Sequence, residues 1–269
     1  MNRKCLFVHH GQCIGVEEFV AAFLALGVRN GDTMFVHSGL GGFGKLGKGY
    51  EKGALCRALI DACKEAVSES GTLAMPTFTY AYCKDRVYDP AESPSEVGVL
   101  GEFFRKEPGV IRSNHPIFSI AAWGRGARAL TDVGLDAFGD RSCFHHLHKR
   151  NAIQVFLGAT LKDSCTFSHY LEQLHRVPYR VMKDFPGVIK TGSGEDPINP
   201  TYFVRPLDGS IATDGRRLSH RLFEREKLVR VPVGAGGVEA IRSDALYREG
   251  MRMLDEDPYS FVARGTPNV

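Results

Sequence analysis

The sequence predicts an α/β fold of three layers, in which helices cover both faces of a largely parallel central sheet, followed by a mixed or antiparallel C-terminal part. Two observations carry this prediction. Apolar runs of strand length alternate with segments of helical periodicity over the first two thirds of the 269 residues, which is typical of a sheet covered by helices. Hydrophobic residues make up 43% and charged residues 24% of the chain, close to the averages of globular domains, so we expect a packed core.

The individual elements follow from periodicity and turn residues. Residues 16–26 carry apolar side chains at helical spacing and stop at Gly27, a usual signal for the end of a helix. The strand-like run 33–37 follows the turn Asn30-Gly31-Asp32. In the same way the sequence predicts, in chain order, a helix at 52–68, a strand at 72–75, a helix at 98–105, a strand at 117–123, a short helix at 125–131 and a strand at 152–157.

The pattern changes in the last third of the chain. Runs at 202–204 and 228–231 look like strands, and the basic stretch 216–230 is interrupted by Glu224 and Glu226, as on a solvated helix face. No linker-like composition marks a boundary, although the change begins near Tyr179. We therefore expect one compact domain over residues 1–269.

Composition excludes several classes of protein. The formal net charge of +3 is too small for a nucleic-acid-binding surface. No run approaches the ~20 consecutive apolar residues of a membrane-spanning helix, and the apolar run near the N-terminus is too short for a signal peptide. The seven cysteines are scattered without a CxxC pair, which argues against disulfides and a structural zinc site. We expect a cytoplasmic protein without nucleic acid, membrane or metal partners; a homo-oligomer stays open.

A glycine-rich segment at residues 39–49 matches two nucleotide-binding patterns incompletely. Its GxxxxGK is followed by Gly49, where a P-loop has a serine or threonine that ligates magnesium. Its GxGxxG lacks a carboxylate at the end of the next strand, which reads Met75-Pro76-Thr77. We interpret the segment as a flexible loop, whose lysines and N–H groups could still meet an anion.

Small hydroxyls and histidines gather at the ends of the predicted strands, where α/β sheets form ligand crevices. Taken alone, each is more typical of a turn or a helix cap. Their coincidence predicts a ligand site at this edge of the sheet. The residues are His37 and Ser38 after the first strand, Thr77 after the second, and Ser113, His115 and Ser119 around the third.

The segment CTFSHYLEQ, residues 165–173, contains a histidine and a glutamate at helical spacing. If Thr166 or Ser168 caps a helix, His169 lies in its first turn and Glu172 shares its face. A carboxylate in that place orients the imidazole and stabilises it once protonated, which suits a base at neutral pH. Spacing alone still favours an ordinary surface histidine beside a glutamate.

A second histidine cluster consists of His145, His146 and His148. No carboxylate beside it completes a ligand set of known spacing, and a catalytic zinc requires three ligands around an open position. We interpret this cluster as the polar start of a helix.

Five separated segments, in order, resemble the aminoglycoside 3-N-acetyltransferase family over roughly residues 15 to 185. They are GDTMFVHSGLGGFG, GTLAMPTFTY, YDPAESPSEVGVLGEFFRKEPGVIRSNHPIFSIAAWG, FGDRSCFHHL and FLGATLKDSCTFSHYLEQ. The resemblance implies an α/β/α fold and direct transfer of an acyl group from acetyl-CoA or another acyl-CoA to an amine, without a metal.

The resemblance also implies coenzyme-binding residues. The HSSL-like motif, which the resemblance places near the coenzyme, corresponds to His37-Ser38-Gly39-Leu40. Gly39 replaces the usual serine, so the hydroxyl contact of that serine has no counterpart at this position. The RSxHPxxS-like motif matches residues 112–119 and is associated with the pantetheine and phosphate channel. The residues implied in coenzyme binding are His37, Ser38, Gly39, Leu40, Thr77, Ser113, His115 and Ser119.

The catalytic residues implied by the resemblance are His169 as general base and Glu172 as its partner, because the histidine and glutamate of the TSLHLAE-like motif fall on them. His169 would take a proton from the amine as it approaches the thioester carbonyl, and Glu172 would hold the imidazolium. A hydrolase using Ser38 or Cys165 lacks the GxSxG elbow. A module that binds coenzyme A without catalysis stays open.

For the acceptor, the resemblance implies an amino sugar. The slightly basic chain and the segment VPYRVMKDFPG, residues 177–187, which looks closer to the nucleotide-sugar branch of the superfamily, favour a nucleotide-linked 3-amino sugar for surface polysaccharides. Its diphosphate would suit Lys183, Arg205 or Arg216. An aminoglycoside antibiotic, a polycation that favours an acidic crevice, is the alternative.

Overall fold

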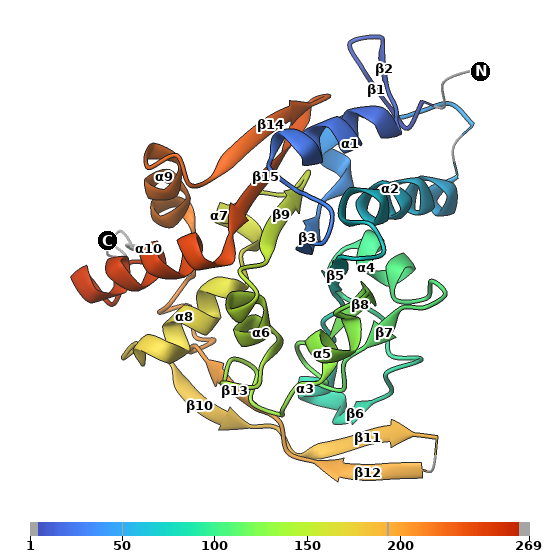
Figure 1. The fold of residues 1–269 in the computed structure, drawn as a ribbon. Helices are drawn as coiled ribbons and strands as arrows, with labels where there is room; N and C mark the ends of the chain where they lie inside the picture. Colours follow the sequence, from blue (N-terminus) through green and yellow to red (C-terminus); the bar gives the residue numbers. More distant parts are fainter. Residues whose placement is uncertain (1–4, 50, 193, 264–269) are drawn as a thin grey trace.

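A seven-stranded sheet is the central element of the computed structural model, which describes residues 5–49, 51–192 and 194–263 (Figure 1). Its strands are β3 (Thr33–Ser38), β5 (Thr72–Pro76), β7 (Ile111–Arg112), β8 (Ile120–Gly124), β9 (Ile153–Leu157), β14 (Val229–Val233) and β15 (Gly236–Arg242). They lie in the order β14-β15-β9-β3-β5-β8-β7. Strands β9, β3 and β5 are parallel neighbours, whereas the outer pairings are antiparallel. All strands of this sheet except β15 and β8 therefore run in one direction, which confirms a largely parallel sheet.

Side chains of the central strands alternate between two helical layers, as the pleat of a strand requires. Met34 and Val36 of β3 pack on one side, whereas Phe35 packs on the other. The first layer contains α1 (Val16–Ala25), α2 (Lys52–Val67) and α4 (Val99–Phe104). The second contains α5 (Ala127–Thr131), α6 (Cys143–Lys149) and α8 (Phe167–His175), with α9 (Arg216–Glu224) and α10 (Ser243–Glu256). The predicted α/β/α layering is confirmed.

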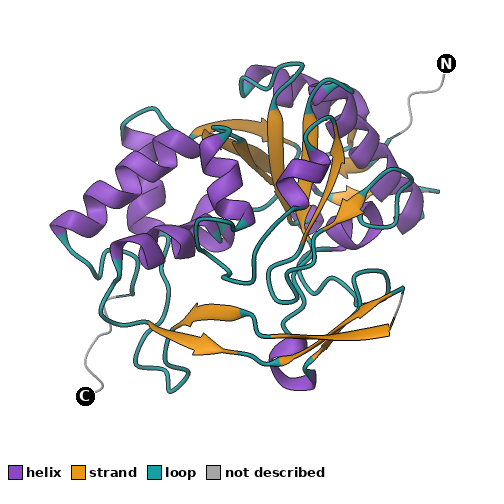
Figure 2. Ribbon diagram, turned by 60° about the horizontal axis from the view of Figure 1, so that its bottom comes forward, coloured by secondary structure: helices purple, strands orange, loops and turns teal. Residues whose placement is uncertain are grey.

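The C-terminal part adds two small sheets beside the central one (Figure 2). In the first, β10 (Val181–Asp184) pairs antiparallel with β13 (Thr201–Val204). In the second, β11 (Gly187–Thr191) pairs antiparallel with β12 (Gly194–Ile198) and parallel with β6 (Val87–Tyr88), which follows α3 (Tyr82–Asp85). This arrangement agrees with the expected mixed or antiparallel C-terminal part.

The interpretation of the glycine-rich segment as a flexible loop is wrong. The segment forms η1 (Leu40–Phe43) and β4 (Lys45–Leu46), and β4 pairs with β1 (Phe7–His9), the partner of β2 (Gln12–Ile14). A Cβ at Gly47 would lie 1.9 Å from the carbonyl oxygen of Cys5. The glycine therefore allows two backbones to approach each other, because it has no Cβ.

The helices also follow the sequence closely. The predicted polar helix start at the histidine cluster is α6, where the Ser142 hydroxyl accepts a hydrogen bond from the His145 amide at 3.2 Å.

Among the described residues, no helix is both long and apolar enough to cross a membrane.

Candidate active site

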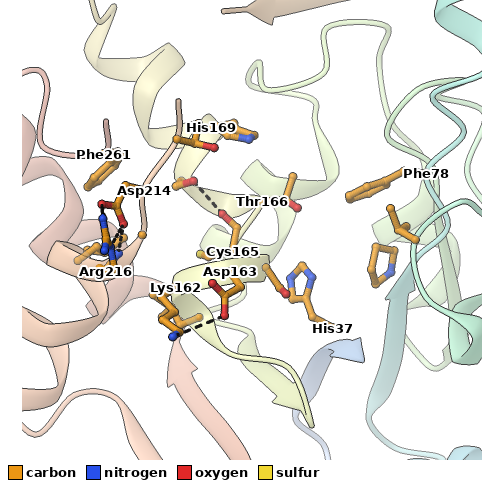
Figure 3. A pocket seen from close by; sticks show the side chains of 18 of the residues that line it. His37, Phe78, Lys162, Asp163, Cys165, Thr166, His169, Asp214, Arg216 and Phe261 are labelled. Atoms are coloured by element: carbon orange, nitrogen blue, oxygen red, sulfur yellow. Dashed lines mark hydrogen bonds and ion pairs between the residues drawn. The ribbon is translucent and has the colours of Figure 1, made fainter. Parts of the chain in front are cut away.

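A cavity of about 680 Å³ opens where the three parallel strands end (Figure 3). His37 and Ser38 from the end of β3 and Pro76 from the end of β5 line it, together with Leu161, which follows β9 and begins α7 (Leu161–Ser164). The carboxyl ends of parallel strands are where α/β sheets bind ligands. The predicted location of the site is therefore matched by a cavity of ligand size.

The opposite wall of the cavity comes from the C-terminal third of the chain. Residues Thr213, Asp214, Gly215 and Arg216 line it next to Phe261 (Figure 3). Asp214 and Arg216 form an ion pair at 2.7 Å. Sequence reasoning named Arg216 alone among these residues, because nothing in the local pattern places them near strand ends more than 100 residues away.

His169 lies on the cavity wall and forms a hydrogen bond to Glu172. The distance from His169 Nδ1 to Glu172 Oε2 is 2.6 Å, and the side chains are 20% and 0% exposed. Both are on α8, so the predicted shared helix face is confirmed. Thr166 occupies the N-cap position without a side-chain capping hydrogen bond, and the Ser168 hydroxyl donates to the Cys165 carbonyl at 2.8 Å. With Nδ1–H directed at the carboxylate, Nε2 carries the lone pair available to a substrate.

Two further residues hold the Glu172 carboxylate. The Tyr179 hydroxyl donates to Oε1 at 2.6 Å. Arg180 Nη2 lies 3.0 Å from Oε2, and its side chain is 1% exposed. Burial raises the pKa of Glu172, but the charges and hydrogen bonds of His169, Arg180 and Tyr179 lower it more, so its pKa is below the usual range. The carboxylate is thus ionised although it is fully buried.

A left-handed turn brings Tyr179 and Arg180 to Glu172. Arg176 ends α8 with a φ of 59°, and the Val177 amide donates to the Glu172 carbonyl at 3.1 Å. This closure of a helix reverses the chain, so the next residues return over the helix end. Sequence reasoning missed both residues; the only signal was a polar pair, Tyr-Arg, soon after the predicted helix.

The predicted coenzyme-binding residues fall into two groups. The first group is the segment 37–40, of which His37 and Ser38 line the cavity. The other two residues lie behind the cavity wall: the Gly39 amide donates to the Leu157 carbonyl at 2.9 Å, and Leu40 packs against the core. His37 is stacked on Phe156 with ring centroids 5.1 Å apart. Burial lowers the pKa of His37 to about 4, against an opposing contribution from the Gln154 side chain, so this imidazole is neutral.

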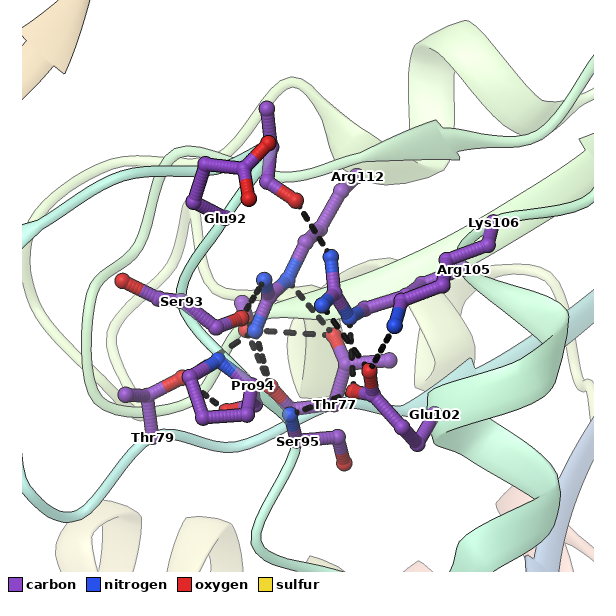
Figure 4. A network of polar contacts seen from close by, with 12 residues as sticks. Thr77, Thr79, Glu92, Ser93, Pro94, Ser95, Glu102, Arg105, Lys106 and Arg112 are labelled. Atoms are coloured by element: carbon purple, nitrogen blue, oxygen red, sulfur yellow. Dashed lines mark hydrogen bonds and ion pairs between the residues drawn. The ribbon is translucent and has the colours of Figure 1, made fainter.

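In the second group, Thr77 and Ser119 belong to a buried network centred on Arg112 (Figure 4). Arg112 Nη2 donates to the Thr77 carbonyl at 2.7 Å, and the Ser119 hydroxyl donates to the same oxygen at 2.6 Å. The Ser113 hydroxyl accepts from the Ile120 amide at 3.0 Å. These hydroxyls lie outside the cavity lining and serve hydrogen bonds within the protein, as buried polar groups require.

His115 also has an internal role. Its Nδ1 accepts from the amides of Ile117 at 3.3 Å and Phe118 at 3.0 Å. Burial lowers the pKa of His115 to about 4, against smaller opposing contributions from the backbone of Leu135 and of His115 itself. The structure therefore places the neutral ring in the turn before β8, away from the cavity lining.

The described residues do not support a hydrolase that uses Cys165 or Ser38 as its nucleophile. Burial raises the pKa of the Cys165 thiol to about 12, although Cys165 lines the cavity; a thiol must lose its proton to act as a nucleophile. No hydrogen bond joins Ser38 to an imidazole in the described chain. In the residues that the structure describes, no three histidine, cysteine, aspartate or glutamate side chains form a group able to hold a metal ion.

An α/β fold with a histidine–glutamate pair on a cavity at the strand ends is equipped for general-base catalysis. A family model described as aminoglycoside 3-N-acetyltransferase matches residues 35–255. The chain belongs to this family.

Individual relatives agree with this assignment. Aminoglycoside N(3)-acetyltransferase IV of a Salmonella species is 28% identical over 249 residues, which cover 91% of this chain and 89% of the relative. The prophage-derived aminoglycoside N(3')-acetyltransferase-like protein YokD of Bacillus subtilis is 31% identical over 180 residues, covering 58% of this chain and 63% of the relative.

Solved structures give the same fold. The apoenzyme of the aminoglycoside acetyltransferase AAC(3)-IVa has a TM-score of 0.75 and 27% identity, over 91% of this chain and 90% of that chain. AAC-IIIb with bound coenzyme A has a TM-score of 0.78 and 25% identity, over 94% and 98%. The predicted family and the class of acyl-CoA-dependent N-acyltransferase are confirmed, and the coenzyme in the second structure agrees with the predicted acyl-CoA co-substrate.

The preference for a nucleotide-linked 3-amino sugar is wrong. The relatives named for their acceptor are aminoglycoside N(3)-acetyltransferases. The error has a physical source, because net charge describes the whole surface and not a pocket. Of the cations invoked for a diphosphate, Lys183 and Arg205 lie outside the cavity lining, and Arg216 is already paired with Asp214.

Proposed function

We propose that this chain transfers the acetyl group of acetyl-CoA to the 3-amino group of an aminoglycoside, with His169 as general base and Glu172 as its partner. The observation that carries the proposal is the 2.6 Å contact between His169 Nδ1 and Glu172 Oε2 on the wall of the cavity. The names of the relatives supply the substrate class.

The proposed reaction is a direct transfer. The amine nitrogen forms a bond to the thioester carbonyl carbon while His169 Nε2 takes its proton. The carbon–sulfur bond then breaks, and coenzyme A leaves as a thiolate that takes up a proton. The anionic Glu172 stabilises the imidazolium that exists between these two proton transfers.

For the coenzyme, we propose contacts with the part of the HSSL-like motif that lines the cavity, His37 and Ser38. Thr77, Ser113, His115 and Ser119 would act by shaping the wall behind it, since their polar groups bond within the protein. We also propose that residues 1–269 act as one domain, because residues on both sides of Tyr179 build the same cavity. Cytoplasmic location and oligomeric state stay predictions.

The test is the replacement His169→Ala. We expect kcat for acetyl transfer to an aminoglycoside to fall by ~10²–10⁴, as for loss of a general base, while the Kd for coenzyme A measured by calorimetry stays within about twofold. His220→Ala is the matched control, because His220 and Glu224 form an exposed pair at 3.3 Å on α9. A His169→Ala enzyme with most of its activity would rule out this base, and a wild-type enzyme inactive on every aminoglycoside tested would rule out the substrate.

A further inference from the structure

Arg180 contacts both members of the catalytic pair. Its Nη2 lies 3.0 Å from Glu172 Oε2 and 3.0 Å from His169 Nδ1. Its Nη1 donates to the carbonyl of Phe203 on β13 at 3.1 Å, which fixes the direction of the guanidinium plane. The side chain is 1% exposed. A permanent cation therefore stands against the imidazole edge that faces the carboxylate.

This contact opposes the effect of Glu172. A carboxylate beside an imidazole favours the protonated ring, and a neighbouring cation disfavours it. A general base is useful only while it is unprotonated, so a histidine held by a carboxylate alone would already be charged in part at neutral pH. An arginine is suited to the opposing role, because its guanidinium keeps its proton in proteins.

The other groups that face His169 carry little charge. The Phe138 ring lies at its edge, with centroids 5.8 Å apart. Burial raises the pKa of Tyr179, as does Glu172 in second place, and burial raises the pKa of Tyr202 on β13, so both phenols are neutral. Cys165, also beside the cavity, is a neutral thiol.

The remaining nearby charges are paired elsewhere. Asp136 accepts from the Gln173 amide at 2.9 and 3.0 Å. Across the cavity, Asp214 and Arg216 form their own pair, and so do Lys162 and Asp163 on the cavity wall, at 3.9 Å. The charges in direct contact with the imidazole are thus those of Glu172 and Arg180.

We propose that Arg180 is a positioning residue that keeps His169 unprotonated in the resting enzyme, while Glu172 holds the ring through Nδ1. The inference rests on the proposed role of His169 as the base. Arg180 acts through the pair and does not itself meet the reacting atoms. A merely structural arginine, one that only ties α8 to β13 through Phe203, would affect stability without moving the pH dependence of catalysis.

The test compares Arg180→Gln, which removes the charge, with Arg180→Lys, which keeps it. We expect the acidic limb of the kcat/KM profile of the Gln variant to move to higher pH by about one to two units, and that of the Lys variant to move by less than about half a unit. Arg248→Gln on α10, an exposed arginine paired with Asp244, is the control and should leave the profile unchanged. An unmoved limb in a folded Arg180→Gln enzyme would overturn the proposal.

A second readout does not depend on turnover. Nitrogen-15 NMR of histidine-labelled protein, with His169→Ala used to assign the signal, follows the ionisation of the His169 ring directly. The ring should take up its proton at higher pH in Arg180→Gln than in the wild type. An inactive wild type would refute the proposed function, whereas an unshifted ring signal in Arg180→Gln would refute only the role of Arg180.

If Arg180→Gln does not fold, variants that lack the Glu172 carboxylate provide a second test. The double variant Glu172→Gln/Arg180→Gln removes both charges, so no unpaired buried ion remains. Glu172→Gln alone keeps the Arg180 charge and is the comparison. The His169 signal of the double variant should again titrate at higher pH than that of Glu172→Gln. The same or a lower midpoint would contradict the proposal.

Discussion

The Glu172 carboxylate is important both for the stability of the fold and for catalysis at the site. Its two oxygens meet an imidazole, a phenol and a guanidinium, while the side chain itself is completely buried. Removing a carboxylate of this kind from water is costly, and the cost is offset only when hydrogen bonds and an opposite charge satisfy it. The same contacts that prepare His169 for catalysis are therefore needed for folding.

Replacement of Glu172 should consequently reduce stability as well as activity. We expect Glu172→Ala to lower the free energy of unfolding by ~3–5 kcal/mol, because Arg180 is left buried without its counter-charge. Urea denaturation followed by circular dichroism measures this change. Glu224→Ala, in the exposed pair with His220, is the control, for which a change within about 0.5 kcal/mol is expected. Equal effects of the two substitutions would contradict this account of Glu172.

At the scale of single residues, the sequence predicts the part of the site that depends on local spacing. His169 and Glu172 are three residues apart, so any helix there places them on one face. Tyr179 and Arg180 reach Glu172 only because Arg176 adopts a left-handed conformation, which a non-glycine residue rarely does. The hydroxyls of Thr77 and Ser119, predicted to contact the coenzyme, form hydrogen bonds within the protein, as buried polar groups require, and local spacing does not reveal these partners.

At the scale of elements, periodicity predicts the helices and strands but not strand direction. Residues 16–26 and 52–68 were expected to be helices and are α1 and α2 to within a residue. A strand shows the same period of two in parallel and antiparallel pairs, so the antiparallel direction of β8 could not be predicted. Strand β15 and helix α10 were not predicted at all. The run GGVEAIR in β15 begins with two glycines, which are poor strand formers.

Gly158, directly after β9, allows the chain there to pass close to the segment that follows β3. Gly158 has a φ of 65°, and a Cβ there would lie 2.5 Å from the Gly39 carbonyl oxygen and 2.7 Å from the Phe43 ring. This contact joins the end of β9 to the loop that follows His37 and Ser38. The glycine therefore sets the position of one wall of the cavity.

We expect Gly158→Ala to destabilise the protein by ~2–4 kcal/mol, because a left-handed backbone and a backbone clash add together. For a chain of this size the midpoint of thermal unfolding should fall by roughly 4–16 °C. Calorimetry measures it. Gly41→Ala in the same loop, where an added Cβ meets nothing within 4 Å, is the matched control, and a similar loss in both variants would show that the close approach is not the cause.

At the scale of the whole molecule, the site combines segments that are far apart in sequence. The strand ends supply His37, Ser38 and Pro76, the helix α8 supplies His169, and the C-terminal third supplies Arg216 and Phe261. The sequence predicted the strand-end side of the cavity, because parallel strands share one carboxyl edge. It did not predict the facing wall, since that wall depends on how the C-terminal part packs against the second helical layer.

The two buried histidines give the whole molecule a pH-dependent stability. The pKa values of His37 and His115 are lowered by burial to about 4 in the folded state, against about 6.5 in an unfolded chain. Between these values the unfolded chain binds more protons than the folded one, so stability falls as the pH falls. Burial also lowers the pKa values of His145 and His148, which adds to the effect with the same sign.

We therefore expect the free energy of unfolding to decrease between pH 7 and pH 5, where carboxylates do not yet titrate, by about 2 kcal/mol for each of the two buried histidines. Urea denaturation across this range measures it. In His115→Asn the amide oxygen can still accept from the Ile117 and Phe118 amides, as Nδ1 does in the wild type, so the fold should be kept while one titrating group is removed. The slope of stability against pH should then be clearly smaller than in the wild type. A free energy that is constant from pH 7 to pH 5, or a slope that His115→Asn leaves unchanged, would show that the buried rings are not held neutral by the fold.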